Sequence, residues 1–455
     1  MVLSGTYRRR NPEQSSFYQC LESYWEEFQE SYPYFYEKDY GPLRAVVERT
    51  VTRFLECGIF RHGFARVRCA HCQHEYLLAF SCKTRYFCPS CQAKRVAAFV
   101  QWVNEEILEP VDHRQYVWTI PRVLRPSFRR DRRLLGELAR CAWKTLQEYC
   151  TACLGRKACV GAIVAIQTYG DQLNWHPHLH SIVSDVAWDS GDHPPPLGSP
   201  DPKILTGLFR HHVLKMLQDQ RRLSREFARR LRSWEPSGFQ VFCGRPVARE
   251  ETAALERLTA YILRPSFAGT RVQFDPQEGQ ITYHTSKGIR RHMDALDWIA
   301  LVTSHIPDVH EQMVRYYGRY SNASRGKRKK AKRQRLSQPS AASSSAESDS
   351  QADRFSRERR RSWARLLKKI YEIDPLRCPQ CGHAMQIIAF IEQPAVIRKI
   401  LRHLQLWQRP PRSPPPPLFP LKLETFLASL TPRQAQQIRA STDSIFWDDV
   451  PVFRD

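Results

Sequence analysis

The sequence predicts an α+β protein with N-terminal helices and a Cys₄ zinc ribbon, a central antiparallel sheet with flanking helices, a linker and a small C-terminal region. Three observations support this fold class: helical periodicity alternates with β-branched stretches of strand length, two Cys-x-x-Cys pairs lie close together, and a basic and then Ser-rich stretch interrupts the chain. A chain of 455 residues is long enough for several domains with their own cores. We place the domain boundaries at 1–110, 111–322, 323–360 and 361–455.

The N-terminal part has the residue spacing of packed helices. Tyr24, Phe28 and Phe54 can face inward at helical spacings in the aromatic stretch that precedes residue 57. A Cys-rich stretch follows. A further helix from about 93 to 108 should end before Pro110, because proline cannot continue a helix.

The central part alternates predicted strands and helices, as expected for an antiparallel sheet covered by helices. The predicted strands are QYVWTIP, VGAIVAIQTYG, LNWHPHLHSIVSD and GFQVFC. The predicted helices are DRRLLGELARCAWKTLQEY, residues 204–218 and EETAALERLTAYIL, which should stop at Pro265. TRVQFD and QITYHT flank PQEG, a pattern that predicts a β-hairpin.

The linker is defined by composition. RGKRKKAKRQR is almost entirely basic, and SQPSAASSSAESDSQAD is a Ser-rich tract of low complexity, so we expect 323–360 to be disordered. The C-terminal region from 361 contains Cys378-Pro-Gln-Cys381 and a proline tract, PRSPPPP.

The charge of the chain indicates a polyanionic partner. Seventy Lys and Arg residues against 46 Asp and Glu give a net charge of +24, which nucleic acid explains best. The sequence contains no apolar stretch of the roughly 18 residues that a membrane-spanning helix requires. Its N-terminus also lacks the apolar core of a signal peptide. We therefore expect a cytoplasmic protein whose fourteen cysteines are thiols or metal ligands.

Two knuckles in the Cys-rich stretch predict a structural Zn²⁺ site. Cys69-Ala-His-Cys72 and Cys88-Pro-Ser-Cys91 are separated by fifteen residues (73–87), and an intervening hairpin can bring the four thiolates around one ion. The alternative is four ordinary buried cysteines. Cys57, Cys82, His71 and His74 lie nearby as substitute ligands, and Cys82 is interpreted as a spare thiol or packing residue.

The knuckle at Cys378 and Cys381 has no second pair in its own region. His383 or His403 could complete a site there, but nothing in the sequence selects either residue. Our interpretation slightly favours a knuckle without metal.

Three histidines alternate in one predicted strand. Residues two apart share a face of a strand, so His176, His178 and His180 should point the same way and bind a divalent metal. Histidines satisfied by hydrogen bonds in the core are the alternative. Gln167, on the preceding strand, is a candidate oxygen ligand or an ordinary strand glutamine.

Tyr261 is the candidate nucleophile. It lies in the last turn of the helix before Pro265, and a tyrosine hydroxyl can attack a phosphodiester that a metal ion polarises. Arg264 can hold the phosphate. The alternative reading of Tyr261 is a core aromatic residue.

Six motifs together resemble a known family. They are, in order, GFARVRCAHC, AFSCKTRYFCPSC, AIQTYGDQLNWHPHLHSIVSD, SGFQVF, YILRPSFAGTRV and VRYYGRYSNASRGKRKK. On these motifs, residues 45–330 resemble the HUH transposases of bacterial insertion sequences, in the insertion sequence ninety-one family. HUH denotes histidine, bulky apolar residue, histidine, here His178-Leu179-His180. PLRCPQCGHAMQIIAFI fits the family too.

The resemblance implies a fold and a mechanism. It implies an RRM-like or ferredoxin-like core for the HUH domain, with Mg²⁺ or Mn²⁺ bound by the HUH histidines. It also implies that Tyr261 attacks single-stranded DNA, forming a 5′-phosphotyrosine bond and freeing a 3′-hydroxyl that primes replication or rejoins strands. No nucleotide cofactor is needed for this chemistry.

One position departs from the two-tyrosine members of the family. They carry a second tyrosine four residues after the first, where this chain has Pro265, so it resembles a single-tyrosine version. Tyr316, Tyr317 and Tyr320 are alternative nucleophiles or DNA-stacking residues.

The expected partners are single-stranded DNA at the ends of a mobile element and target DNA, and the resemblance implies association with the nucleoid. Cations in and near the motifs are predicted to contact this DNA: Arg264, Lys83, Arg85, Arg122, Arg125, Arg315, Lys327, Arg328, Lys329 and Lys330. Two other functions remain open at this point: an HUH replication initiator, and a zinc-dependent DNA-binding regulator with an unused catalytic site.

Overall fold

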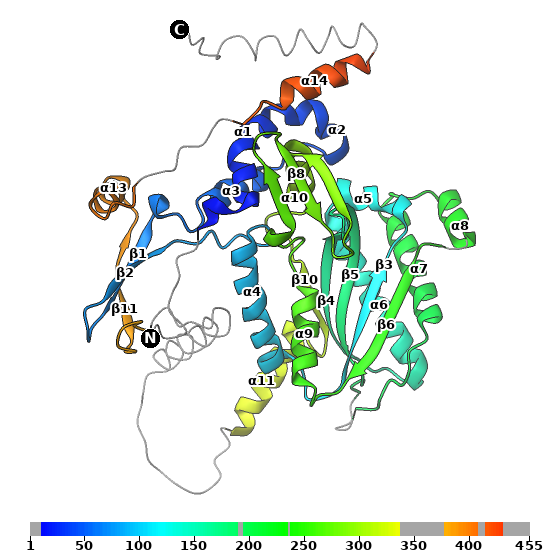
Figure 1. Cartoon of the computed structure of the whole chain (residues 1–455). Coiled ribbons are helices and arrows are strands. Elements are labelled where there is room, and N and C mark those ends of the chain that lie inside the picture. Colours follow the sequence, from blue (N-terminus) through cyan, green and yellow to red (C-terminus); the bar gives the residue numbers. More distant parts are fainter. Residues whose placement is uncertain (1–10, 190–193, 235–236, 337–376, 408–414, 431–455) are drawn as a thin grey trace, which may run out of the picture. The chain divides into compact units, whose positions relative to one another are not determined.

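The computed structural model confirms the α+β class and divides the chain into two compact units (Figure 1). The structure describes residues 11–189, 194–234, 237–336, 377–407 and 415–430. Of the described residues, the first unit contains those within Met1–Pro12, Arg44–Ala268 and Leu301–Gln408, and the second contains those within Glu13–Leu43, Gly269–Ala300 and Arg409–Asp455. Within the described ranges, no helix has the length and apolarity that crossing a membrane requires.

A five-stranded sheet forms the centre of the first unit. Its order is β10-β4-β5-β3-β6, and every neighbouring pair is antiparallel. The strands are β3 (His113–Thr119), β4 (Gly161–Tyr169), β5 (Trp175–Ser184), β6 (Gln240–Val247) and β10 (Val314–Gly318). Four of them lie where the sequence predicts them. The edge strand β10 is not predicted, because its sequence VRYYG lacks the alternation of a half-buried strand.

Each face of this sheet is covered by helices (Figure 1). On one face α6 (Arg133–Leu154) and α7 (Pro202–Asp219) bury the side chains of Val164, Leu179 and Val183. On the other face lie α9 (Thr252–Ile262), α4 (Pro89–Trp102) and its continuation, the π-helix η3 (Val103–Ile107). Because side chains alternate along β5, Leu179 faces α6 and α7, and its histidine neighbours face α9.

A second sheet in the first unit joins distant parts of the sequence. Its order is β11-β1-β2, from β1 (Phe64–Cys69), β2 (Glu75–Ala79) and β11 (Met385–Ile391). We refer to this sheet as the ribbon. The prediction of a separate C-terminal domain beginning at 361 is therefore wrong for β11, which forms a ladder with β1. Sequence patterns do not reveal this pairing because its partners lie more than 300 residues apart.

Helices lie before and after the ribbon strands in the sequence. α3 (Ala45–Leu55) precedes β1, and α13 (Pro394–His403) follows β11 and buries Ile397 and Leu401 against Phe60 and Phe64. The other short elements of this unit are η2 (Phe60–His62), η4 (Arg122–Leu124), α5 (Arg125–Arg130) and α8 (Arg225–Ser233).

The first part of the predicted disordered linker is helical. The helix α11 (Asn322–Leu336) contains the basic stretch, so the expectation of disorder is wrong up to residue 336. Ion pairs from Arg328 to Glu109 at 2.9 Å and from Lys329 to Glu106 at 3.3 Å offset part of the repulsion along the helix. The Ser-rich tract lies outside the described residues.

The second unit also combines distant segments, and it contradicts the predicted boundary at 110. It contains α1 (Ser16–Phe35), α2 (Glu37–Tyr40), α14 (Phe419–Ala428) and the sheet β7-β8-β9. The strands are β7 (Val272–Asp275), β8 (Gln280–His284) and β9 (Arg290–Asp294), and α10 (Ala295–Ser304) crosses the division. Tyr24 and Phe28 are buried as predicted, and Lys422 Nζ lies 2.7 Å from Asp294 and 2.6 Å from Asp297.

Candidate active site and cysteine clusters

The structure places two of the three predicted histidines together. His178 and His180 are buried on the α9 side of β5, with their Nε2 atoms 3.0 Å apart. His178 Nδ1 lies 2.7 Å from the carbonyl oxygen of His176, so that nitrogen donates and Nε2 carries the lone pair. An octahedral ion with bonds of about 2.1 Å separates adjacent ligands by about 3.0 Å, so the pair fits such an ion.

Burial keeps both rings in the neutral form that binds metal. It lowers the pKa of His178 to about 4 and that of His180 to about 2, and the charge of Arg264 acts in the same direction on both rings. Neutral imidazoles present lone pairs without first releasing protons.

Gln167 lies on the strand next to the histidine pair. It faces His178 in the β4–β5 ladder, and its Nε2 lies 3.4 Å from the carbonyl oxygens of Tyr261 and Ile262. Its Oε1 is buried and accepts no hydrogen bond from the described residues. A buried amide oxygen without a partner is costly, so Gln167 Oε1 is a candidate third ligand for an ion held by the histidine pair.

His176 is not brought into the same cluster. No group of three or more ligand atoms within 4.8 Å of one another, among the residues that the structure describes, contains the three histidines. An irregularity in the β4–β5 register between Gln167 and Tyr169 disturbs the regular alternation at this end of β5. The expectation of three imidazoles around one ion is therefore reduced to two.

Tyr261 lies against the histidine pair. Its ring meets the His180 ring edge-to-face at 5.0 Å, and the Arg264 guanidinium lies 4.6 Å from the centre of the tyrosine ring. The Tyr261 side chain is 39% exposed, so a large substrate can reach it. The predicted proximity of tyrosine, histidines and Arg264 is thus present in the structure.

Side chains hold the end of the Tyr261 helix. The last carbonyls of a helix lack partners within it. Here Gln167 binds those of Tyr261 and Ile262, Gln92 Nε2 donates to Leu263 O at 3.0 Å, and the Tyr169 hydroxyl donates to Arg264 O.

Gln92 was missed by sequence analysis. It is fully buried on α4, and its Oε1 accepts the Tyr86 N–H at 2.9 Å. Gln92 directly follows Cys91, so the residue that donates a hydrogen bond to the end of the Tyr261 helix is next in sequence to a cysteine of a candidate metal site. No local pattern could have shown that its amide reaches Leu263.

Two arginines make the site electropositive. The charges of Arg264 and Arg125 both lower the pKa of His178, so both lie near it. Each has a buried Nε with no hydrogen-bond partner among the described residues. Arg122 is exposed, and its charge acts on Arg125. This arrangement suits a phosphate group beside the histidine pair.

An aromatic and cationic pocket of about 680 Å³ adjoins the end of α9. Trp102 and Tyr316 meet edge-to-face at 5.8 Å, and the Arg325 guanidinium lies 5.4 Å and 5.5 Å from their ring centres. Leu263 lines this pocket, together with Arg85, Tyr86, Arg95, Phe99 and Arg315. Such a surface can stack bases and bind phosphates.

The three alternative tyrosines have other surroundings. Tyr317 stacks on Trp143 at 5.3 Å, and the fully buried Tyr320 lies 2.6 Å from His113 Nε2. Tyr316 belongs to the pocket, and burial raises its pKa to about 12. Burial also raises the pKa of the Tyr317 and Tyr320 hydroxyls, which disfavours the phenolate in all three.

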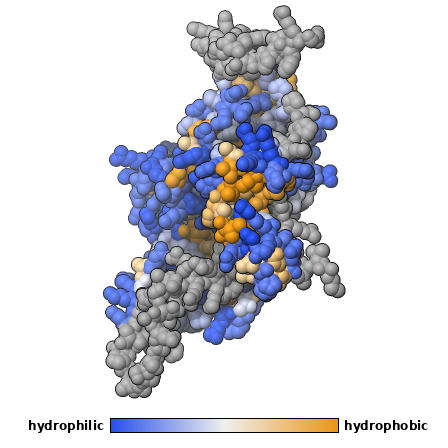
Figure 2. Space-filling model, turned by 90° about the vertical axis from the view of Figure 1, so that its left-hand side faces the viewer, coloured by the Kyte–Doolittle hydropathy of each residue, from blue (hydrophilic) through white to orange (hydrophobic). Residues whose placement is uncertain are grey.

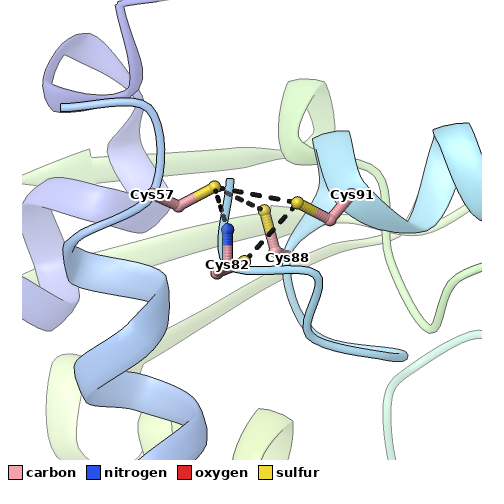
Figure 3. A group of neighbouring side chains, drawn as sticks. All are labelled: Cys57, Cys82, Cys88 and Cys91. Atoms are coloured by element: carbon pink, nitrogen blue, oxygen red, sulfur yellow. Dashed lines mark hydrogen bonds between the residues drawn. The ribbon is translucent and has the colours of Figure 1, made fainter. Parts of the chain in front are cut away.

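The predicted zinc site is wrong in its grouping. Cys88 and Cys91 cluster with Cys57 and Cys82 rather than with the first knuckle (Figure 3). The Cys57 sulfur lies 3.8 Å from that of Cys88 and 3.7 Å from that of Cys91, and Cys82 lies 3.5 Å from Cys91. A tetrahedral Zn²⁺ with bonds of about 2.3 Å separates its sulfurs by about 3.8 Å. Cys82 is thus a member of this cluster and not a spare thiol.

The first knuckle belongs to a different cluster. Cys69 and Cys72 converge with Cys378 and Cys381, so the C-terminal knuckle does have a second pair. The physical reason is the position of the first knuckle at the turn between β1 and β2, next to β11, whereas Cys88 and Cys91 begin α4.

The predicted DNA-binding cations fall into several surroundings. Arg264 and Arg125 lie at the histidine pair, Arg85 and Arg315 line the pocket, and Lys83 is exposed in the loop between Cys82 and Cys88. On α11, Lys327 and Lys330 are exposed, whereas Arg328 and Lys329 form ion pairs within the protein.

Two protein-family models and two curated proteins match parts of the chain. Residues 161–329 match the protein-family model described as "Putative transposase", and residues 21–120 match an IS91-type model described as "Transposase zinc-binding domain". The chain is 26% identical over 370 residues to the "Transposase for insertion sequence element IS801" of Pseudomonas savastanoi pv. phaseolicola, covering 77% of this chain and 85% of that protein.

A second relative covers less of the chain. The "Putative transposase y4qJ" of Sinorhizobium fredii (strain NBRC 101917 / NGR234) is 27% identical over 149 residues, which are 32% of this chain and 37% of that protein. No solved structure is significantly similar to the chain.

Proposed function

Because this chain belongs to the IS91 (insertion sequence ninety-one) family of transposases and carries the family's zinc-binding domain, we propose that it cleaves and rejoins single-stranded DNA through Tyr261. The observation that carries this proposal is the contact of the exposed Tyr261 with His180, whose Nε2 lies 3.0 Å from that of His178. The biological outcome is the mobilisation of an insertion sequence by rolling-circle transposition.

The proposed cleavage is a transesterification. The Tyr261 hydroxyl oxygen forms a bond to phosphorus and loses its proton, while the bond from phosphorus to the 3′-oxygen breaks and that oxygen takes up a proton. The products are a 5′-phosphotyrosine link and a free 3′-hydroxyl. Arg264 and Arg125, whose charges both act on His178, would hold the scissile phosphate.

His178, His180 and Gln167 are the residues that would hold a divalent ion, Mg²⁺ or Mn²⁺. Such an ion supplies charge stabilisation at the phosphoryl group. The residues themselves orient the site, because Gln167 also holds the carbonyl end of the Tyr261 helix. His176 lies beside this set, with its ring centre 4.9 Å from that of His178.

Rejoining uses the same site in reverse. A 3′-hydroxyl attacks the phosphotyrosine and releases Tyr261, so the bond energy is conserved and no nucleotide cofactor is required. Position 265, four residues after Tyr261, is a proline that lies beyond the end of α9 at Ile262, so no second tyrosine stands there. The proposed enzyme therefore works with one tyrosine.

The proposed zinc role is structural. A Zn²⁺ ion held by Cys57, Cys82, Cys88 and Cys91 has no open coordination position. It would fix the start of α4, where Cys88 is the N-terminal flanking residue and Gln92 extends toward the Tyr261 helix.

The experiment that tests the function uses labelled single-stranded DNA from the origin end of the element. Purified protein with Mg²⁺ or Mn²⁺ should give a covalent protein–DNA adduct on a denaturing gel, and chelation of the ion should remove it. Tight DNA binding without any adduct would favour a DNA-binding regulator.

Gln92→Ala should slow adduct formation by about tenfold to a hundredfold, because a displaced nucleophile loses its alignment with the phosphate. Single-turnover rates with saturating DNA measure the effect. Gln101→Ala is the matched control, since that amide lies on the same helix and, among the described residues, donates hydrogen bonds only to Glu105. Equal rates for Gln92→Ala and wild type would show that the Leu263 contact does not position Tyr261.

The double variant Trp102→Ala/Tyr316→Ala should bind a labelled oligothymidylate about tenfold to a hundredfold more weakly, because stacking on an aromatic residue is worth about 1–3 kcal/mol per base. Fluorescence anisotropy measures the affinity. Trp234→Ala removes an exposed tryptophan that does not line the pocket and serves as the control. Unchanged affinity in the double variant would rule out the pocket as a base-stacking site.

A further inference from the structure

The cluster of Cys69, Cys72, Cys378 and Cys381 differs from the one that supports the active site. The Cys69 sulfur lies 3.5 Å from that of Cys381, and the Cys72 sulfur lies 3.3 Å from that of Cys378. All four sulfurs lie within 4.8 Å of one another. We propose that these cysteines bind a second structural Zn²⁺ ion, which ties the C-terminal strand β11 to the N-terminal hairpin.

The two knuckles share one backbone geometry. In the first, Cys69 N–H donates to His74 O at 2.8 Å and Gln73 N–H donates to Cys69 O at 3.0 Å. In the second, Cys378 N–H donates to His383 O at 2.8 Å and Gly382 N–H donates to Cys378 O at 2.9 Å.

The residue after each knuckle shares a left-handed conformation, with φ of 62° for Gln73 and 72° for Gly382. Backbone N–H groups inside each knuckle also point at its first sulfur: those of His71 and Cys72 at Cys69, and those of Gln380 and Cys381 at Cys378. The turns at Cys69–Cys72 and Cys378–Cys381 therefore share one conformation, and their cysteines face each other.

The ladder between β1 and β11 brings the turns together. It runs from Cys69 opposite Met385 to Phe64 opposite Ile391, so both knuckles lie at the same end of the ribbon. The His71 and His383 rings, one from each side, stack at 3.9 Å with an angle of 6°.

The strand β11 leaves most of its apolar side chains exposed. Only Met385 is buried along this strand, while Ile387, Ile388 and Phe390 are 42%, 45% and 66% exposed. An apolar patch is visible on the mostly hydrophilic face in Figure 2. A strand that buries so little apolar surface of its own would gain stability from a structural metal at its end.

Two alternatives use the same atoms. Disulfides would require sulfurs about 2.05 Å apart, well below the separations here. A site from His71, Cys381 and His383 would take Cys381 away from the four-sulfur set and is more exposed. Four converging thiols favour the Cys₄ site.

The test is the zinc content of the full-length chain, purified with a reductant and measured by native mass spectrometry. Wild type should carry two Zn²⁺ ions per chain, and Cys378→Ser/Cys381→Ser should carry one. Cys153→Ser, which changes an exposed cysteine outside both clusters, should retain two. One ion in wild type, unchanged by Cys378→Ser/Cys381→Ser, would overturn the proposal.

A second measurement covers the case in which the double variant does not fold. Alkylation of the wild-type chain should spare Cys69, Cys72, Cys378 and Cys381 until a chelator is added, and Co²⁺ substitution should give the thiolate charge-transfer band of tetrahedral sulfur sites. Alkylation of these four cysteines while zinc is bound elsewhere, or disulfide-linked peptides between them in the zinc-loaded chain, would contradict the proposal. Neither readout depends on DNA cleavage, so the result stands apart from the proposed function.

Discussion

Tyr261→Phe should abolish the covalent protein–DNA adduct while leaving the affinity for single-stranded DNA within about twofold of wild type. The substitution removes only the hydroxyl group. The phenyl ring keeps its edge-to-face contact with His180 and its position beside the Arg264 guanidinium. Loss of a catalytic nucleophile lowers turnover by as much as about 10⁶-fold in well-studied enzymes, so no adduct should be visible on a denaturing gel.

The control variants for this result are Tyr316→Phe and Tyr317→Phe. Both should form the adduct at rates close to wild type, because Tyr316 lies in the pocket and Tyr317 stacks on Trp143. An adduct that survives Tyr261→Phe and disappears in one of the controls would move the nucleophile to β10. Thermal melting of each variant would separate lost chemistry from lost fold.

The parts of the site that rest on local rules were predictable from the sequence. Alternation along a strand puts His178 and His180 on one face, and proline ends the helix that carries Tyr261. Two consecutive strands joined by a short turn usually pair antiparallel, and this rule is also local. It places Gln167 opposite the histidine strand.

The parts that depend on distant segments were not predictable. The two knuckles that were predicted to share one Zn²⁺ lie in different clusters. Cys69 and Cys72 meet a cysteine pair more than 300 residues away in the sequence. Cys88 and Cys91 meet two single cysteines that have no Cys-x-x-Cys spacing. The contact of Gln92 with Leu263 joins residues 171 positions apart. Spacing rules find ligands within a turn but do not tell which turns meet.

The helix α11 shows a different limit of sequence analysis. A run of positive charge predicts a solvated and disordered segment, since like charges repel along a helix. Acidic partners outside the run, Glu106 and Glu109, pair with Lys329 and Arg328 and reduce that repulsion. The composition of the basic run does not reveal these acidic partners, because only the fold brings them next to the helix.

His180→Ala should lower the rate of adduct formation by about 10²- to 10⁴-fold, since it removes one of two imidazoles whose Nε2 atoms lie 3.0 Å apart, together with the charge stabilisation of the ion they would hold. His178→Ala should have a similar effect. Single-turnover rates measured over a range of Mn²⁺ concentrations test this, and the ion concentration for half-maximal rate should rise in both variants.

His176→Ala is the matched control for that prediction. It removes a neighbouring imidazole from the same strand, but this ring does not join a three-ligand cluster with His178 and His180 in the described part of the chain. We therefore expect its rate to fall by only about tenfold, the low end of the loss for groups that surround metal ligands, with little change in the Mn²⁺ dependence, because the substitution keeps the His176 carbonyl oxygen that lies 2.7 Å from His178 Nδ1. If His176→Ala were as damaging as His180→Ala, the ion would need all three imidazoles and the strand would have to straighten at His176 when the ion binds.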